Sequence, residues 1–271
     1  MVRYQYCSYT TVSFIDDHNN AKFHSEKEIL TDMDGVKKLL SIQNLQKSYG
    51  QHEVLKGVDL KIEKGEILGF VGGNGAGKTT TLNCIAGLVE QNCGKIMINN
   101  VAKSQSLEYK KQFYYIPDTI HVFPNIAAYD WIHFVLKLYE KIDNEKLQRF
   151  ISIFGMGKSI YKPMGTYSYG MLHKMALITA FTISPPILIM DEPLNGLDPL
   201  AVVAFKNCMK EYVEKGGTIL FSTHLLDVAE KICQSISFLK DGKIVLHERV
   251  ENLLVNGSLE TIFMEKQAHE G

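Results

Sequence analysis

The chain is organised around the glycine-rich segment Gly72-Gly73-Asn74-Gly75-Ala76-Gly77-Lys78-Thr79-Thr80. This segment follows the apolar run 67–71 and precedes apolar residues at helical spacing, which predicts a strand, a loop and a helix. The spacing fits G-x-x-x-x-G-K-[ST], a pattern whose backbone N–H groups surround phosphate oxygens at a helix N-terminus. Lys78 would neutralise the β and γ phosphates, and the Thr79 hydroxyl would hold Mg²⁺. The segment therefore predicts a nucleotide-binding protein.

Length and composition are those of an ordinary globular protein. Of the 271 residues, 45% are hydrophobic and 22% are charged, which is enough to bury one substantial core. The formal net charge is −1 and the basic residues do not cluster, so we expect no nucleic-acid partner. The five cysteines form no C-x-x-C pair, which favours a reducing cytosol. No apolar run reaches the roughly 18 residues of a membrane span, and the N-terminus has no secretion pattern.

Residues 1–38 carry no regular hydrophobic period. Met33 stands shortly before the first strand-like segment, so a start at Met33 would remove nothing that is visibly foldable. We therefore interpret residues 1–38 as an extension, and we hypothesise that residues 1–32 are not part of the native protein.

The rest of the chain alternates strand and helix patterns. Alternating apolar residues predict two half-buried antiparallel strands at 39–45 and 54–62, joined through Tyr49-Gly50. We predict an α/β fold, with a P-loop NTPase core, an N-terminal antiparallel β subdomain and an inserted α-helical subdomain at about 118–182. Further strands are expected at 67–71, 94–100, 114–117, 187–190, 218–221, 236–239 and 243–246, and helices at 126–158, 170–181, 200–213, 226–233 and, in the tail 251–271, after Asn256-Gly257.

Two carboxylates follow a wholly apolar strand. Asp191 and Glu192 come directly after residues 187–190, at the carboxyl end where open α/β sheets bind ligands. Asp191 would hold Mg²⁺, and Glu192 would polarise the attacking water. His224 follows the strand at 218–221 and is a candidate γ-phosphate sensor. In isolation these residues would suit a solvated strand end and a turn histidine, and the glycine-rich loop upstream is what favours catalysis.

Five motifs occur together and in a fixed order. They are the glycine loop, Tyr167-Ser168-Tyr169-Gly170-Met171, residues 187–193, Gly196-Leu197-Asp198-Pro199 and Ser222-Thr223-His224. Together they resemble the motifs of the ATP-binding cassette ATPases of ABC transporters. The resemblance covers about residues 39–250 and implies one ATPase domain there, with ATP and Mg²⁺ as its cofactors. It also implies a head-to-tail pair with a second ABC ATPase subunit, as a homodimer or a heterodimer.

The resemblance assigns roles to four more residues. Tyr49, in the turn after the first strand, would stack on adenine. Ser168 and Gly170 would bind the γ-phosphate held by the second subunit. Asp198 would lie in the loop that crosses between the two phosphate sites. The active site would therefore be complete only in the dimer.

Three motifs depart from the family pattern. Tyr169 and Met171 replace a glycine and the glutamine of the usual L-S-G-G-Q signature. Asp118 stands where the family has a glutamine that senses Mg²⁺; a carboxylate can ligate Mg²⁺ but, when ionised, cannot donate a hydrogen bond. Gly73 replaces a frequent proline without removing an N–H donor. The pattern I-P-[DE], together with a signature that ends in G-M, is similar to bacterial exporters of peptides, drugs and bacteriocins.

The resemblance implies the ATP-hydrolysing subunit of a bacterial exporter. It would be cytoplasmic and peripheral on the inner face of the cell membrane, and it would move separate membrane-spanning permease subunits. The alternative is a soluble ABC ATPase that acts on a ribosome, DNA or a cofactor-assembly scaffold. Several aromatic residues follow Asp118, namely Phe123, Trp131, Phe134 and Tyr139. Most of them are expected in the core of the helical subdomain. The other interpretation is that they line a groove for the membrane subunit.

Overall fold

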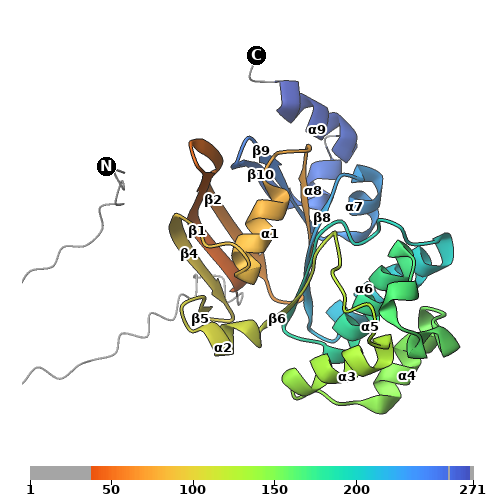
Figure 1. Cartoon of the computed structure of the whole chain (residues 1–271). Helices are drawn as coiled ribbons and strands as arrows, with labels where there is room; N and C mark the ends of the chain where they lie inside the picture. The colour runs from red at the N-terminus through yellow and green to blue at the C-terminus, as the bar shows by residue number, and fades with distance from the viewer. Residues whose placement is uncertain (1–37, 256, 269–271) are drawn as a thin grey trace, which may run out of the picture. The chain divides into compact units, whose positions relative to one another are not determined.

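The structure, a computed structural model, describes residues 38–255 and 257–268. The expected extension at residues 1–38 therefore lies almost wholly outside the described residues. The first strands, β1 (Lys38–Tyr49) and β2 (His52–Glu63), pair antiparallel. On its other side β1 pairs antiparallel with β4 (Cys93–Ile98), which pairs with β5 (Val101–Ala102). These strands form a four-stranded antiparallel sheet in the order β2-β1-β4-β5 (Figure 1).

The second sheet has six strands in the order β10-β9-β3-β8-β7-β6. The strands from β9 to β6 run parallel, and β10 pairs antiparallel with β9 at one edge. Because β8 lies between β3 and β7, the residues that follow these three strands meet at one end of the sheet. The strands are β3 (Ile67–Gly72), β6 (Phe113–Ile116), β7 (Ile187–Met190), β8 (Thr218–Thr223), β9 (Ser235–Lys240) and β10 (Lys243–Arg249).

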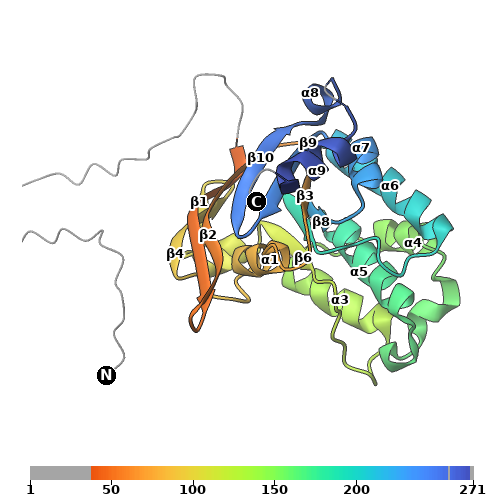
Figure 2. The ribbon, with the colours of Figure 1, turned by 90° about the horizontal axis from the view of Figure 1, so that it is seen from above.

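The core lies on both faces of the six-stranded sheet. Successive residues of β3 point to opposite faces, so Leu68 and Phe70 pack with α1 and the antiparallel sheet, whereas Ile67 and Val71 pack with the helical side. In Figure 2, α1 lies beside β6. The helices α3, α4 and α5 lie together, away from β1 and β2. The helices are α1 (Lys78–Ala86), α2 (Ser106–Lys110), α3 (Ala128–Leu138), α4 (Asn144–Ile153), α5 (Tyr169–Ile183), α6 (Pro199–Glu214), α7 (Leu226–Ile232), α8 (Val250–Leu254) and α9 (Leu259–Ala268).

The predicted fold class is confirmed. The long helical region expected at 126–158 consists of two helices, α3 and α4, followed by short 3-10 turns at Gly157–Tyr161 and Met164–Thr166. The sequence did not predict α2, because five residues are too few to establish a helical period. Within the described part of the chain, no helix is long and apolar enough to cross a membrane.

The buried face of α3 does not include all of the aromatic residues expected in the core. Val135 and Leu136 are buried, whereas Phe134 is 52% exposed and Leu138 is also exposed. Phe123, in the preceding loop, is exposed as well. The expectation that these aromatic residues form the core is therefore wrong for Phe123 and Phe134. Because α3 carries apolar residues around most of its circumference, their spacing alone fits more than one buried face.

Candidate active site

The glycine loop joins β3 to α1 at the carboxyl edge of the parallel strands. Gly75 and Gly77 have φ angles of 81° and 107°, which residues with a side chain rarely adopt. A Cβ atom at Gly72 would lie 2.5 Å from the backbone oxygen of Leu239, so this position also requires glycine. A Cβ atom at Gly73 would meet nothing within 4 Å, so a side chain would fit there. The loop ends at the N-terminus of α1, which has no side-chain cap, and the N–H groups there can donate hydrogen bonds to an anion.

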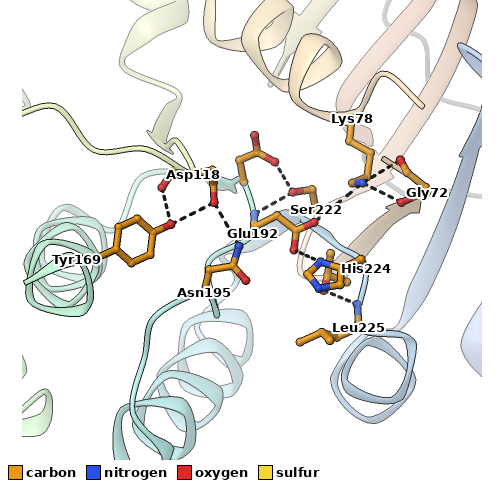
Figure 3. Close-up of polar contacts among 12 residues, drawn as sticks. Gly72, Lys78, Asp118, Tyr169, Glu192, Asn195, Ser222, His224 and Leu225 are labelled. Atoms are coloured by element: carbon orange, nitrogen blue, oxygen red, sulfur yellow. Dashed lines mark hydrogen bonds and ion pairs between the residues drawn. The ribbon is translucent and has the colours of Figure 1, made fainter. Parts of the chain in front are cut away.

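Lys78 begins α1 and its side chain turns back into the loop (Figure 3). Its Nζ donates hydrogen bonds to the backbone oxygens of Gly72, at 2.8 Å, and Gly73, at 3.3 Å. The same Nζ lies 4.0 Å from Oε1 of Glu192. Only 8% of the residue is exposed, so the ammonium group depends on these partners and would also be stabilised by a phosphate.

Asp191 follows β7 and is 1% exposed. Ser222 on β8 donates its hydroxyl to Oδ1 of Asp191, and the same hydroxyl oxygen accepts a 2.9 Å hydrogen bond from the backbone N–H of Glu192. Oδ2 of Asp191 is buried and has no hydrogen-bond partner among residues 38–255 and 257–268. Because a buried carboxylate oxygen needs compensation, Oδ2 is suited to bind a cation.

Glu192 and His224 form the second polar pair of the site. Oε2 of Glu192 lies 3.0 Å from Nδ1 of His224 (Figure 3). Glu192 has a φ angle of 47°, a left-handed conformation that costs on the order of 1–3 kcal/mol for a residue with a side chain. The hydrogen bond from its N–H to Ser222 and the contact with His224 hold it there. The strained backbone therefore directs the carboxylate toward Lys78 and His224.

The predicted residues from four separate segments line one cavity of about 490 Å³. Its lining residues are His52, Val54, Gly73, Asn74, Gly75, Gly77, Lys78, Thr79, Thr80, Asp118, Asp191, Glu192, Asn195 and His224. Gly72 and Ala76 belong to the loop but are not among the lining residues. A larger cavity of about 650 Å³ lies elsewhere, next to residues that precede the strands, such as Lys64, Pro186 and Gly217, and it contains none of the predicted residues.

Sequence reasoning missed three residues of this cavity: His52, Val54 and Asn195. His52 and Val54 are two residues apart on β2, so their spacing indicates a shared face but not that this face borders the glycine loop. Asn195 follows Glu192 within three residues, and its polar amide was the one available signal. Its direction depends on the turn at Gly196, which has a φ angle of 72°.

Tyr49 is the last residue of β1 and pairs with His52, so the predicted position in a turn after the strand is wrong. The side chain is 50% exposed and is not among the residues that line the cavity. Nζ of Lys47 lies 5.0 Å from the centre of its ring. The structure therefore does not bring Tyr49 into the cavity with the glycine loop, and adenine stacking stays a prediction.

Ser168 and Gly170 stand at the N-terminus of α5. Ser168 caps this helix, since its hydroxyl oxygen accepts a 3.3 Å hydrogen bond from the backbone N–H of Met171. A Cβ atom at Gly170 would lie 2.3 Å from the backbone oxygen of Gly196, so the first turn of α5 packs directly on the loop after Glu192. Neither residue lines the cavity of its own chain. Their predicted contact with a second subunit's nucleotide stays a prediction.

Asp198 caps α6 and also lies outside the cavity. Its Oδ1 accepts a 2.9 Å hydrogen bond from the backbone N–H of Ala201, and its Oδ2 pairs with Nζ of Lys174 on α5. The hydrogen bond from Lys174, followed by that from Ala201, lowers the pKa of Asp198. The ionised carboxylate therefore joins the N-termini of α5 and α6.

Asp118 follows β6 and lines the cavity. Its Oδ1 accepts hydrogen bonds from Nδ2 of Asn195 and from the hydroxyl of Tyr169, both at 3.2 Å. Its backbone oxygen accepts from the Tyr169 hydroxyl at 2.9 Å and from Nε2 of His173 at 3.0 Å. Burial, followed by the charge of Asp118, raises the pKa of Tyr169 to about 12, and burial lowers the pKa of His173. Both donors are therefore neutral near pH 7.

A magnesium site here would need oxygen atoms from both protein and nucleotide. In the described segments, no group of three or more His, Cys, Asp or Glu side chains could hold a metal ion alone. The protein oxygens that fit are the hydroxyl of Thr79, Oδ2 of Asp191 and the carboxylate of Asp118. Hard oxygen ligands of this kind suit Mg²⁺, which usually keeps phosphate and water ligands as well.

Comparison with known proteins agrees with the resemblance to the ATP-binding cassette ATPases. Residues 55–195 match the family model for the ABC transporter family. The lantibiotic transport ATP-binding protein SrtF of Streptococcus pyogenes is 30% identical over 225 residues, which are 83% of this chain and 96% of SrtF. The ABC-type transporter ATP-binding protein EcsA of Bacillus subtilis (strain 168) is 34% identical over 210 residues, which are 76% of this chain and 85% of EcsA.

A solved structure, described as the ATP binding subunit of an ABC transporter, superimposes with a TM-score of 0.79 at 30% sequence identity. The match covers 84% of this chain and 99% of that chain. The two sheets, the glycine loop at the edge of the parallel strands and the sequence relatives agree. The chain belongs to the ABC transporter family of ATPases.

Proposed function

We propose that this chain is the ATP-binding and hydrolysing subunit of a bacterial ABC exporter, with ATP and Mg²⁺ as its ligands. The observation that carries the proposal is the meeting of Lys78, Asp191 and the Glu192–His224 pair around one cavity. The name of SrtF, a lantibiotic transport ATP-binding protein, supports a role in transport, and export is the direction that the family resemblance implies.

Phosphate binding follows from the loop and the start of α1. The N–H groups of the loop and the Nζ of Lys78 supply hydrogen bonds and positive charge for the β and γ phosphates. Thr79, Asp191 and Asp118 would hold the magnesium ion, which supplies charge neutralisation for the phosphates. The uncompensated Oδ2 of Asp191 is the feature of this chain that best fits a cation.

Hydrolysis would use Glu192 as the group that orients and polarises the attacking water. The contact with Nδ1 of His224 restrains the carboxylate, and Lys78 lies 4.0 Å from its other oxygen. His224 would also sense the γ-phosphate, because it stands at the end of β8 beside the same cavity. These assignments give each polar side chain a separate task.

The proposed assembly contains two cassettes, as a homodimer or a heterodimer, and separate membrane-spanning permease subunits. Ser168 and Gly170 at the start of α5, and Asp198 at the start of α6, lie outside the cavity of their own chain and would face the second ATPase subunit. ATP binding would close the pair of cassettes and hydrolysis would reopen it. This cycle would couple ATP hydrolysis to a conformational change of the permease. The chain would act at the inner face of the cell membrane.

Replacement of Glu192 by Gln tests this function. The amide keeps the size and one hydrogen-bond acceptor but cannot take up a proton, so ATP binding should persist while hydrolysis falls by about 10²- to 10⁴-fold. With hydrolysis suppressed, ATP should trap a dimer. Phosphate release, equilibrium ATP binding and size-exclusion chromatography measure the three effects.

The control is Glu214→Gln, which makes the same chemical change at an exposed position at the end of α6. It should hydrolyse ATP like the parent and form no trapped dimer. Parental hydrolysis by the Glu192→Gln variant would exclude Glu192 as the catalytic base.

A further inference from the structure

Two departures from the family pattern, Tyr169 and Asp118, contact each other. They are 51 residues apart in the chain, yet the Tyr169 hydroxyl shares its proton between the backbone oxygen of Asp118, at 2.9 Å, and Oδ1 of the same residue, at 3.2 Å. Figure 3 shows the ring pointing from α5 toward Asp118. A glycine at position 169, as in the usual signature, has no group that could form this contact.

The ring of Tyr169 is held in place by its surroundings. It lies over Gly196, where an added Cβ atom would come within 2.3 Å of Cδ1 of the tyrosine. The ring centroid is 4.4 Å from that of His173, one turn further along α5. Because a carbonyl oxygen can only accept, Nε2 of His173 carries the proton in its 3.0 Å contact with Asp118. Two side chains of α5, Tyr169 and His173, therefore donate hydrogen bonds to Asp118.

The two oxygens of the Asp118 carboxylate have different surroundings. Oδ1 accepts from Tyr169 and from Asn195, a residue of the loop that follows Glu192. Oδ2 has no hydrogen bond with any residue that the structure describes, and Asp118 lines the nucleotide cavity. Hydrogen bonds from outer residues to a carboxylate fix its orientation for a metal, and their loss commonly weakens metal binding by about 10- to 100-fold.

We propose that Tyr169 is a positioning residue: its hydroxyl holds the Asp118 carboxylate toward the cavity and so links occupation of this chain's own nucleotide site to the signature loop, residues 167–171. This inference rests on the proposed function, because it requires Mg²⁺ and nucleotide in the cavity. In the proposed dimer the signature loop meets the nucleotide of the second subunit. The Tyr169–Asp118 contact therefore connects one nucleotide site to the other within a single chain.

The matched variants are Tyr169→Phe and Tyr167→Phe. Each removes one hydroxyl from the same loop, but the Tyr167 hydroxyl donates to the backbone oxygen of Ser159, at 2.6 Å, and not to Asp118. Binding of the fluorescent, non-hydrolysable probe mant-AMPPNP is titrated with Mg²⁺ for each protein. Tyr169→Phe should require on the order of tenfold more Mg²⁺ while metal-free binding stays at the parental level. Tyr167→Phe should follow the parent in both.

Hydrogen exchange of the first turn of α5, residues 169–173, provides a second readout that does not depend on hydrolysis. In the parent and in Tyr167→Phe, adding Mg²⁺ to the nucleotide-bound protein should slow exchange in this turn. In Tyr169→Phe the turn should no longer respond to Mg²⁺. Asp118→Asn is a second variant, since it keeps an oxygen for Tyr169 but loses the charge; it should weaken Mg²⁺-dependent binding and abolish the exchange response.

The outcomes separate the two proposals. If the parent itself shows no Mg²⁺-dependent nucleotide binding, the proposed function fails and this inference fails with it. If the parent shows such binding and Tyr169→Phe matches Tyr167→Phe in both the Mg²⁺ titration and the exchange of residues 169–173, the inference alone is overturned.

Discussion

Two side chains at the β1–β2 turn are candidates for contact with the adenine base. Tyr49 matches the family position, but it does not line the cavity, and Lys47 lies over its ring. His52, its partner across the strand pair, does line the cavity. An aromatic ring with one free face can still stack on a base, and such stacking contributes about 1–3 kcal/mol.

Replacing Tyr49 by Ala should therefore weaken ATP binding by about tenfold and leave the binding of inorganic triphosphate unchanged, because only the base loses a contact. Competition of both ligands against a fluorescent nucleotide measures the difference. Glu53→Ala, at an exposed position of β2 that does not line the cavity, is the control and should bind both ligands like the parent. A base-specific loss in His52→Ala, and none in Tyr49→Ala, would transfer the stacking role to the histidine.

At the scale of elements, a charged pair joins α4 to α6. Arg149 on α4 donates to Oε1 of Glu211 on α6 at 2.9 Å, and Lys215 adds a contact of 2.6 Å. The hydrogen bond from Arg149, followed by that from Lys215, lowers the pKa of Glu211 from its ordinary value of 4.5 to about 2. Because the folded protein favours ionised Glu211, this group stabilises the fold above pH 4.5 and loses that contribution as the pH falls toward 2.

Glu211→Gln should therefore flatten the acid side of the stability curve. The free energy of unfolding should fall less between pH 4.5 and pH 2 than in the parent, by no more than about 1 kcal/mol, because the pair is partly exposed to solvent. Urea unfolding at a series of pH values measures this difference. Glu214→Gln, three residues further along α6, should keep the parental slope, and an unchanged slope in Glu211→Gln would contradict the assignment.

Elements with a uniform environment were predictable from the sequence. The wholly buried β7 appeared as an apolar run, and the strands of the antiparallel sheet appeared as alternation. Motifs and the family resemblance identified eleven of the residues that line the cavity but missed His52, Val54 and Asn195, and the direction of Asn195 depends on a tight turn. Tyr169 and Asp118 could each be recognised from the sequence as a departure from the family pattern. Their contact was not predictable, because it depends on how α5 packs against the end of β6.

At the scale of the whole molecule, exposed apolar side chains gather on the helical subdomain. Phe123 and Phe134 flank Trp131, with ring centroids 5.6 Å apart in each pair, and Leu138 is exposed one turn beyond Phe134. A cluster of exposed apolar side chains commonly marks an interaction site. Since the family resemblance implies a groove for the membrane subunit in this subdomain, we propose that these residues contact the permease.

The double variant Phe134→Gln, Leu138→Gln should therefore recover less permease when the tagged chain is purified from solubilised membranes, while its ATP binding stays parental. Met264→Gln, at a highly exposed position on α9, is the control and should recover permease like the parent. Equal recovery by the double variant would exclude this surface. Recovery of ribosomes in place of an integral membrane protein would favour the soluble alternative.

The unpartnered Oδ2 of Asp191 also affects the folding equilibrium. A buried polar atom without a partner destabilises a protein by about 1–3 kcal/mol, and a ligand that satisfies this atom returns that free energy when it binds. The free energy of unfolding of the ligand-free chain is therefore lowered by the same amount that satisfying Oδ2 contributes to the binding free energy of the ligand. The melting temperature of the chain then depends on the concentrations of nucleotide and cation, and a cell depleted of ATP would hold a larger unfolded fraction of it.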